Sequence, residues 1–189
     1  MDSALIVSHS ENSSSYLKEV LLQASVSNIT TIANAGETRR ILIEKDFDLC
    51  IINAPLPDEF GESLACNIAA KGISEVILLV KAEYFDEISE KVEDFGVITI
   101  AKPLSKALLW TSLKIAQAAH RKVLAMRSEN NKLLNKIEDI RIVDRAKCIL
   151  IAHLSMTEPE AHRYIEKQAM DMRLTRRQGA EGILRTYEN

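Results

Sequence analysis

Runs of apolar residues alternate with segments of helical periodicity along the first 120 residues. The apolar runs predict five strands, at residues 5–7, 29–33, 49–52, 76–80 and 97–100. Between them, residues 16–22, 37–44, 64–70 and 85–92 place apolar side chains at the spacing of an amphipathic helix. This alternation, with short connections, predicts an α/β domain with a doubly wound, five-stranded parallel sheet. Ligands of such sheets bind at the carboxyl ends of the strands.

A second pattern predicts an extended coiled-coil helix after the fifth strand. No helix breaker occurs between Pro103 and Pro159, so the helix can continue past the sheet. Apolar residues then recur at alternating separations of three and four residues, as in a coiled coil. The pattern starts at Ala116 and Ala119, and we predict a dimer seam formed by Val123, Met126, Asn130, Leu133, Ile137 and Ile140. A buried Asn at an a position, as Asn130 would be, fixes the register of a parallel dimer. The alternative is one amphipathic helix packed within a single chain.

The last 45 residues predict a small all-α module of three short helices. Apolar residues recur at helical spacing, and two capping boxes mark helix starts, at Thr157 with Glu160 and at Thr175 with Gln178. Such helices are too short to hold a core alone, so we expect them to pack on one another through alanines. Gly179 and Gly182 lie in the third helix, and each costs about 1 kcal/mol against Ala in a helix.

Charge is distributed unevenly between the two halves of the chain. The net charge is −3, but residues 1–110 hold 9 Lys/Arg and 17 Asp/Glu, whereas residues 111–189 hold 15 and 10. A basic back half suggests that a polyanion would bind there. The alternative is that the basic helix faces are merely solvated. The candidate contacts are Arg141, Arg145, Lys147, Arg173, Arg176 and Arg177.

Composition narrows the functional classes further. Cys50, Cys66 and Cys148 are scattered and lack metal-ligand spacing, which is typical of reduced thiols in a cytoplasmic protein. No apolar run reaches the roughly 18 residues that a membrane span needs, and no export signal is readable. Neither a nucleophile–base pair nor a metal cluster can be assembled. We therefore expect a cytoplasmic protein that is not an enzyme, requires no metal or cofactor, and does not bind membranes.

The C-terminal segment resembles the ANTAR RNA-binding domain over about forty residues without a gap. The residues that carry the resemblance are Ala146, Lys147, Leu150, Thr157, Glu160, Ala161, Ala169, Met170, Asp171, Ala180, Ile183 and Leu184. The resemblance implies a transcription antiterminator that binds paired hairpins in a leader RNA. It assigns RNA contact directly to Lys147, whereas the arginines rest on charge and position alone.

The first 120 residues resemble the receiver domain of bacterial response regulators. The resemblance rests on residues 46–49, on Pro55, Pro57 and Gly61 in the next loop, and on residues 101–104, which include a Lys-Pro step that is often cis in the family. It also implies a phosphorylation pocket, whose positions here hold Ser8, His9, Asn53, Val80 and Lys102. Because Asn53 is neither a nucleophile nor a carboxylate ligand, and Ser8 and His9 replace an acidic pair, we predict a pseudo-receiver that is not phosphorylated. Lys102 is expected to be hydrogen-bonded locally or solvated, with anion binding as the alternative.

These patterns combine into one predicted organisation and function. We expect a pseudo-receiver over residues 1–120, a coiled-coil helix over 116–143 and an ANTAR-like module over 144–189. The predicted function is that of a dimeric antiterminator in which the pseudo-receiver serves regulation. The signal would come from a partner protein on the receiver, as in the amidase-type regulators that the chain resembles, or activity would be constitutive. The competing hypotheses are an adaptor whose C-terminal helices dock a protein, and a DNA-binding response regulator.

Overall fold

All five predicted strands are present in the computed structural model, which describes residues 1–187, and they pair in parallel. The strands are β1 (Ser3–Val7), β2 (Asn28–Ile32), β3 (Leu49–Asn53), β4 (Glu75–Lys81) and β5 (Ile98–Lys102). Their order in the sheet is β2-β1-β3-β4-β5. Ile6 is in register with Ile51, and Ile51 with Ile77, so apolar side chains form continuous rows across the sheet. The predicted doubly wound sheet is confirmed.

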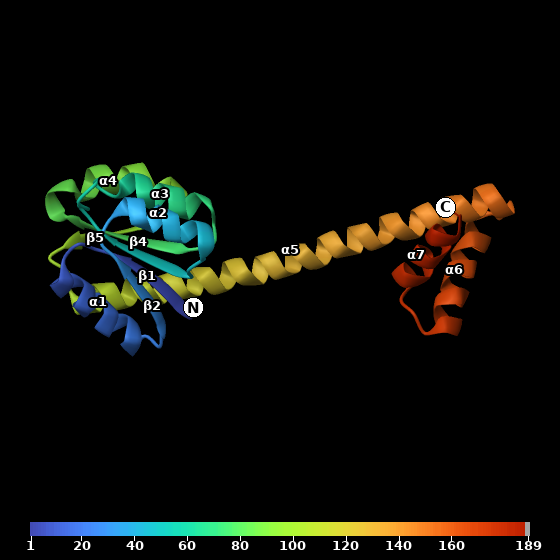
Figure 1. Cartoon of the computed structure of the whole chain (residues 1–189), viewed down its shortest axis with the longest axis horizontal. Coiled ribbons are helices and arrows are strands. Elements are labelled where there is room, and N and C mark those ends of the chain that lie inside the picture. Colours follow the sequence, from blue (N-terminus) through green and yellow to red (C-terminus); the bar gives the residue numbers. More distant parts are fainter. Residues whose placement is uncertain (188–189) are drawn as a thin grey trace. The chain divides into compact units, whose positions relative to one another are not determined.

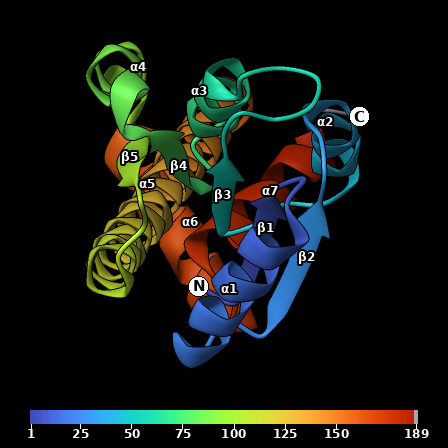
Figure 2. The same ribbon diagram turned by 90° about the vertical axis from the view of Figure 1, so that its left-hand side faces the viewer.

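Helices cover both faces of the sheet (Figures 1 and 2). They are α1 (Glu11–Gln23), α2 (Ala35–Glu44), α3 (Glu62–Ala70), α4 (Phe85–Val92) and the first part of α5 (Lys106–Leu154), with short 3-10 turns η1 (Ala82–Tyr84) and η2 (Glu93–Phe95). Helices α2, α3 and α4 lie over one face, and α1 and α5 over the other. Successive strand residues point to opposite faces. Ile52 and Leu78 therefore belong to the first core, whereas Ile51 and Ile77 belong to the second.

Helix α5 runs for 49 residues without a break. The first of the three short helices predicted in the C-terminal segment is therefore not separate, because it is the last part of α5. The reason is that no proline or glycine interrupts the sequence between Pro103 and Pro159, and nothing else stops the backbone ladder. The chain divides into two compact units, Met1–Leu124 and a second unit that begins at Ala125. Within the described residues, no helix combines the length and the hydropathy needed to cross a bilayer.

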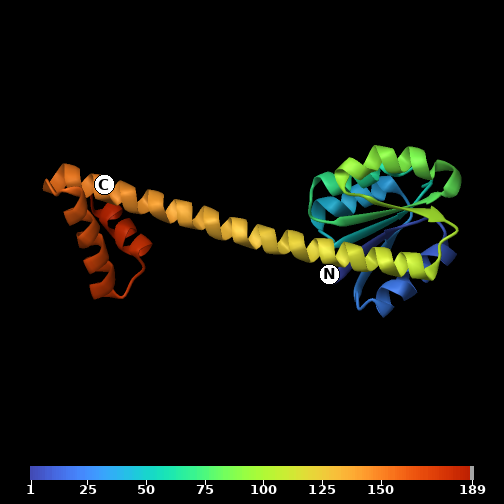
Figure 3. The same cartoon turned by 180° about the vertical axis from the view of Figure 1, so that it is seen from behind.

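The second unit contains the end of α5 together with α6 (Glu158–Met172) and α7 (Arg176–Tyr187), which lie side by side in Figure 3. Both predicted capping boxes form. The Thr157 backbone N–H donates to Glu160 Oε2 at 2.8 Å, and the Thr175 backbone N–H donates to Gln178 Oε1 at 2.9 Å. The core of this unit is small and rich in alanine. Its buried members are Ala146, Leu150, Ala161, Ile165, Ala180 and Ile183.

The two glycines of α7 occupy opposite environments. A Cβ built on Gly179 would meet the Ala169 Cβ of α6 at 3.3 Å, whereas a Cβ on Gly182 would meet nothing within 4 Å. Gly179 thus allows α6 and α7 to approach closely. Gly182 leaves its position in α7 open to solvent and adds only backbone freedom to the unfolded chain.

We predict that Gly182→Ala stabilises α7 by about 1 kcal/mol, because alanine restricts the unfolded chain and meets no obstacle. Amide hydrogen exchange in α7 should slow by about fivefold, the factor that corresponds to that energy. Gly179→Ala is the matched control. It should bring no slowing, since its methyl group presses on Ala169. Equal slowing in both variants would show that the helices can separate without cost.

Candidate functional site

The carboxyl ends of β1, β3 and β5 bring Ser8, Asn53 and Lys102 into one hydrogen-bonded chain. Lys102 Nζ donates to Asn53 Oδ1 at 2.9 Å and also to the Ala54 carbonyl, while Asn53 Nδ2 donates to Ser8 Oγ at 3.0 Å. Ser8 and Asn53 are both buried. The side chains that replace the receiver chemistry therefore satisfy one another. Lys102 is hydrogen-bonded locally, the first of the expected alternatives, and the Lys102–Pro103 bond is cis.

Two predicted members of this pocket lie elsewhere. Val80 is buried in the core under α2, α3 and α4, because side chains alternate along β4 and Val80 points to the opposite face from Asn53. The next residue, Lys81, ends β4 and is in register with Lys102. His9 is exposed to solvent. Burial and, second to it, the charge of Lys81 lower the pKa of Lys102. Lys81 was not predicted as a pocket residue, because the apolar run ends at Val80, one residue before the end of β4.

No carboxylate takes part in the hydrogen bonds that join Ser8, Asn53 and Lys102. Among residues 1–187, no group of three His, Cys, Asp or Glu side chains is arranged to hold a metal ion. The chemistry of this donor set is that of neutral hydroxyl and amide groups around one cation. Such a set is poorly suited to a hard divalent cation, which prefers charged oxygen ligands.

The seam residues of α5 are exposed along the helix. Val123, Met126, Leu133, Ile137 and Ile140 are each 36–61% exposed, and Asn130 is also exposed. No residue from 121 to 138 is covered by another part of the described chain to any large extent. The alternative, in which these side chains pack within one chain, therefore has no packing partner for them among residues 1–187. They form a narrow apolar stripe that is open to solvent.

In the second unit, a groove of about 510 Å³ gathers basic side chains over an apolar floor. It is lined by Lys136, Asp139, Ile140, Val143, Asp144, Lys147, His162, Thr175, Arg176 and Arg177. Three of the six predicted basic contacts, Lys147, Arg176 and Arg177, are thus brought together. The lining holds four cations and two carboxylates, and three further carboxylates, Glu158, Glu166 and Glu181, pair with these cations from outside the lining. Lys136 was not among the predicted contacts, since it lies within the heptad region rather than in the ANTAR-like segment.

Lys147 is held by carboxylates from two helices. Its ammonium lies 2.8 Å from Asp144 Oδ1 on α5 and 2.9 Å from Glu158 Oε1 at the start of α6, and its side chain is 17% exposed. Hydrogen bonds to these two acids raise the pKa of Lys147 to about 12, and the same lysine lowers the pKa of Glu158. Lys147 therefore links α6 to α5, and two carboxylates balance its charge in the groove.

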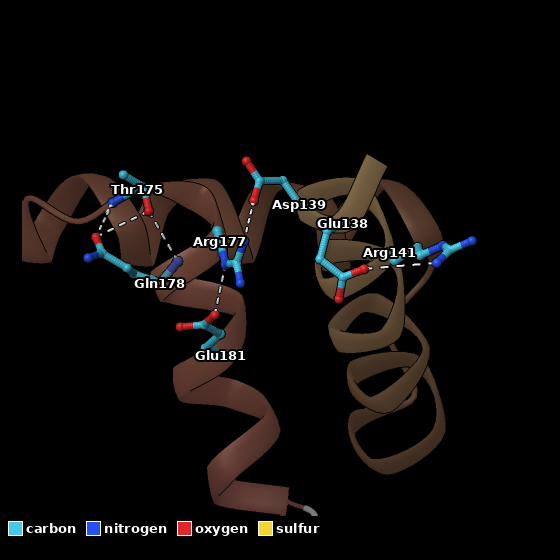
Figure 4. A network of polar contacts seen from close by, with 7 residues as sticks. All are labelled: Glu138, Asp139, Arg141, Thr175, Arg177, Gln178 and Glu181. Atoms are coloured by element: carbon cyan, nitrogen blue, oxygen red, sulfur yellow. Dashed lines mark hydrogen bonds and ion pairs between the residues drawn. The ribbon is translucent and has the colours of Figure 1, made fainter. Parts of the chain in front are cut away.

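Arg177 makes a similar bridge from α7, shown in Figure 4. Its Nη1 lies 3.0 Å from Asp139 Oδ1 on α5, and its Nε lies 2.9 Å from Glu181 Oε1 on α7. Hydrogen bonds to Glu181 and Asp139 raise the pKa of Arg177. Arg176 lies 3.3 Å from Glu166 on α6. All of these groups are partly exposed, and solvent screens such ion pairs, so each contributes little to stability.

The other three predicted contacts lie outside the lining of the groove. Arg141 is on α5, 3.9 Å from Glu138, with 74% of its side chain exposed. Arg145 is exposed one turn further along α5. Arg173 ends α6 in the left-handed conformation, with φ of 55°. The structure thus separates the predicted basic residues into a groove set and a scattered set.

Comparison with known proteins assigns both units. Residues 131–184 match the ANTAR domain family. The chain is 32% identical over 140 residues to the transcriptional regulatory protein PdtaR of Mycobacterium tuberculosis H37Rv, an alignment that covers 74% of this chain and 68% of PdtaR.

Solved receiver structures share the fold of the first unit. The signal receiver domain of an HD domain-containing protein from Pseudomonas fluorescens Pf-5 aligns with a TM-score of 0.56 at 20% identity, covering 64% of this chain and 89% of that one. The response regulatory domain of mrkE from Klebsiella pneumoniae aligns with a TM-score of 0.56 at 16% identity, covering 64% and 98%. With the match to PdtaR and the ANTAR match, these findings show that the chain belongs to the ANTAR-domain regulatory proteins that carry a receiver-like N-terminal domain.

Proposed function

We propose that this protein is an RNA-binding regulator of transcription antitermination that acts in the cytoplasm. In this proposal it binds paired hairpins of a leader RNA as a parallel homodimer. Its pseudo-receiver, residues 1–120, is not phosphorylated and takes its signal from a partner protein or leaves activity constitutive. The coiled coil spans residues 116–143 and the RNA-binding module residues 144–189. No catalytic step is part of this function.

The observation that carries the proposal is the exposed seam on α5 beside the basic groove. Ile137 and Ile140 are 48% and 60% exposed at heptad positions, and Ile140 also lines the groove. Burying such a half-exposed aliphatic side chain contributes on the order of 1 kcal/mol. A seam of this kind is stabilised by a second copy, which then supplies a second groove.

Two grooves on one dimer suit an RNA with two similar elements. Each groove offers Lys136, Lys147, Arg176 and Arg177 for phosphate, around the floor residues Ile140 and Val143. Phosphate contacts supply most of the non-specific affinity and make binding dependent on salt. Joining two such contacts raises the affinity further through effective concentration. This is the physical reason to expect a requirement for paired hairpins.

The proposal that the receiver is not phosphorylated rests on Asn53 and its partners. Phosphorylation of a receiver needs a carboxylate as the nucleophile and a metal ion to neutralise the developing charge. Asn53 offers an amide that already holds Lys102, and Ser8 accepts the other end of that amide. In this proposal the first unit does not switch between phosphorylated and unphosphorylated states, and its surface is available to bind a partner protein.

The first test of this proposal is binding to a two-hairpin leader RNA. Wild-type protein should bind it at least tenfold more tightly than either hairpin alone or duplex DNA, with a steep salt dependence. The double variant Arg176→Ala, Arg177→Ala should lose about tenfold in affinity and reduce the salt slope by about two. Arg40→Ala, an exposed arginine of the first unit, should change neither. Weak, equal binding to every nucleic acid would instead favour a module that docks a protein.

The second test concerns the seam. Leu133→Ala should weaken dimerisation by at least tenfold in sedimentation equilibrium, since Leu133 occupies a d position and the truncation removes on the order of 1 kcal/mol of burial from each chain. Leu124→Ala is the matched control, because Leu124 is 50% exposed, as Leu133 is 51% exposed, but lies off the seam. If both variants dimerise like the wild type, α5 does not use this seam.

The third test concerns the receiver. Beryllofluoride with Mg²⁺ mimics the phosphoryl group on a receiver aspartate. Because position 53 holds an asparagine, adding both should leave the amide NMR shifts of the first unit unchanged. Asn53→Asp supplies the missing carboxylate and should still show no response, because Ser8 and His9 replace the acidic pair that would hold the metal. A Mg²⁺-dependent shift in the wild-type protein would contradict the assignment.

A further inference from the structure

The groove of the second unit adjoins the seam, and this proximity gives a dimer a composite site. Ile140 belongs to both, as a d position of the heptad pattern and as part of the groove floor. Lys136 lies on the rim of the same groove. A second α5 packed on the seam would therefore bring its own side chains to the edge of the groove.

The heptad pattern identifies which residue the second copy contributes. With Ile137 at a and Ile140 at d, Lys136 occupies a g position and Arg141 an e position. In a parallel two-stranded coiled coil, a g residue faces the e residue of the following heptad on the other helix. Lys136 of one chain therefore faces the partner's Arg141.

Arg141 does not line the groove of its own chain. It follows Lys136 by five residues, which turns it about 140° around the helix at 3.6 residues per turn. Figure 4 shows Arg141 on the side of α5 away from Asp139 and Arg177. Only a parallel partner places this guanidinium beside Lys136. The same geometry would be absent from an antiparallel pair.

Lys136 and the partner's Arg141 repel each other in the absence of an anion. In the part of the chain that the structure describes, no carboxylate lies within 4.0 Å of the Lys136 ammonium. Arg141 has Glu138 at 3.9 Å, with 52% of the acid exposed, so its charge is only weakly compensated. Like charges at facing positions destabilise a coiled coil, and the two-fold symmetry of a dimer repeats the pair.

Resting on the proposed function, we infer that Lys136 and the partner's Arg141 form a phosphate-binding site across the dimer seam. The site extends the groove of Arg176 and Arg177, so one RNA backbone contacts both chains. RNA phosphate neutralises the repelling pair, and RNA binding and dimerisation therefore strengthen each other by the same factor. Without RNA, the dimer is weakened by its own charges.

The test is charge reversal at one member of the pair, because it should move the two equilibria in opposite directions. Lys136→Glu replaces two repulsions by two attractions, so dimerisation without RNA should tighten about tenfold in sedimentation equilibrium. Affinity for the two-hairpin RNA should fall about tenfold at fixed salt. Lys132→Glu is the matched control, since it makes the same change in charge at an exposed c position off the seam. It should leave dimerisation unchanged.

A double variant isolates the pair itself. Lys136→Glu with Arg141→Glu restores a like-charge pair, so dimerisation should return to the strength of the wild type or below, while RNA affinity falls further. Circular dichroism of each variant verifies that the helices are intact.

The outcomes separate this inference from the proposed function. If Lys136→Glu dimerises no more tightly than Lys132→Glu, while the wild type still dimerises and binds paired hairpins, the composite site is wrong and the proposed function stands. If the wild type neither dimerises nor binds the RNA, both are wrong. Opposite shifts in the two equilibria, reversed for dimerisation by the double variant, would support the site.

Discussion

The uninterrupted backbone hydrogen-bond ladder of α5 is the constraint on which the other features depend. At one end it buries Leu109, Leu113 and Ala116 against the sheet, and at the other it buries Ala146 and Leu150 against α6 and α7. Residues 121–138 between these ends are exposed. Helices without tertiary packing are marginal in water, so the middle of α5 relies on its two anchored ends and, in our proposal, on a second copy.

Sequence patterns were sufficient for the elements and for the cores, because those depend on local periodicity. The strands followed from apolar runs, and both capping boxes followed from side chains only three residues apart. The receiver pocket was harder to predict. Val80 ends the apolar run of β4, yet the strand continues to Lys81, and a shift of one residue moves a side chain to the other face of the sheet. An apolar run cannot specify where a strand ends when the last residue is charged.

Sequence periodicity could not predict the groove, for a different reason. The ion pairs that join α5 to α6 and α7 link residues distant in the sequence, such as Asp139 and Arg177, which are 38 positions apart. Helical spacing within one segment cannot predict such pairs. The count of charged residues did show that this region is basic. It could not distinguish Arg177, whose guanidinium pairs with two carboxylates, from Arg173, which caps α6. For the same reason Lys136 was not predicted as a contact, because its proposed role depends on its position between the groove and the seam.

The contact between Gly179 and Ala169 has a consequence for how this fold can vary. With 3.3 Å between the Ala169 methyl group and the place where a Cβ on Gly179 would stand, the two positions share one small volume. A side chain can grow on α6 only where its neighbour on α7 stays small, and the reverse holds equally. The two positions therefore limit each other's size, and a side chain larger than alanine at position 169 would require α7 to move away from α6.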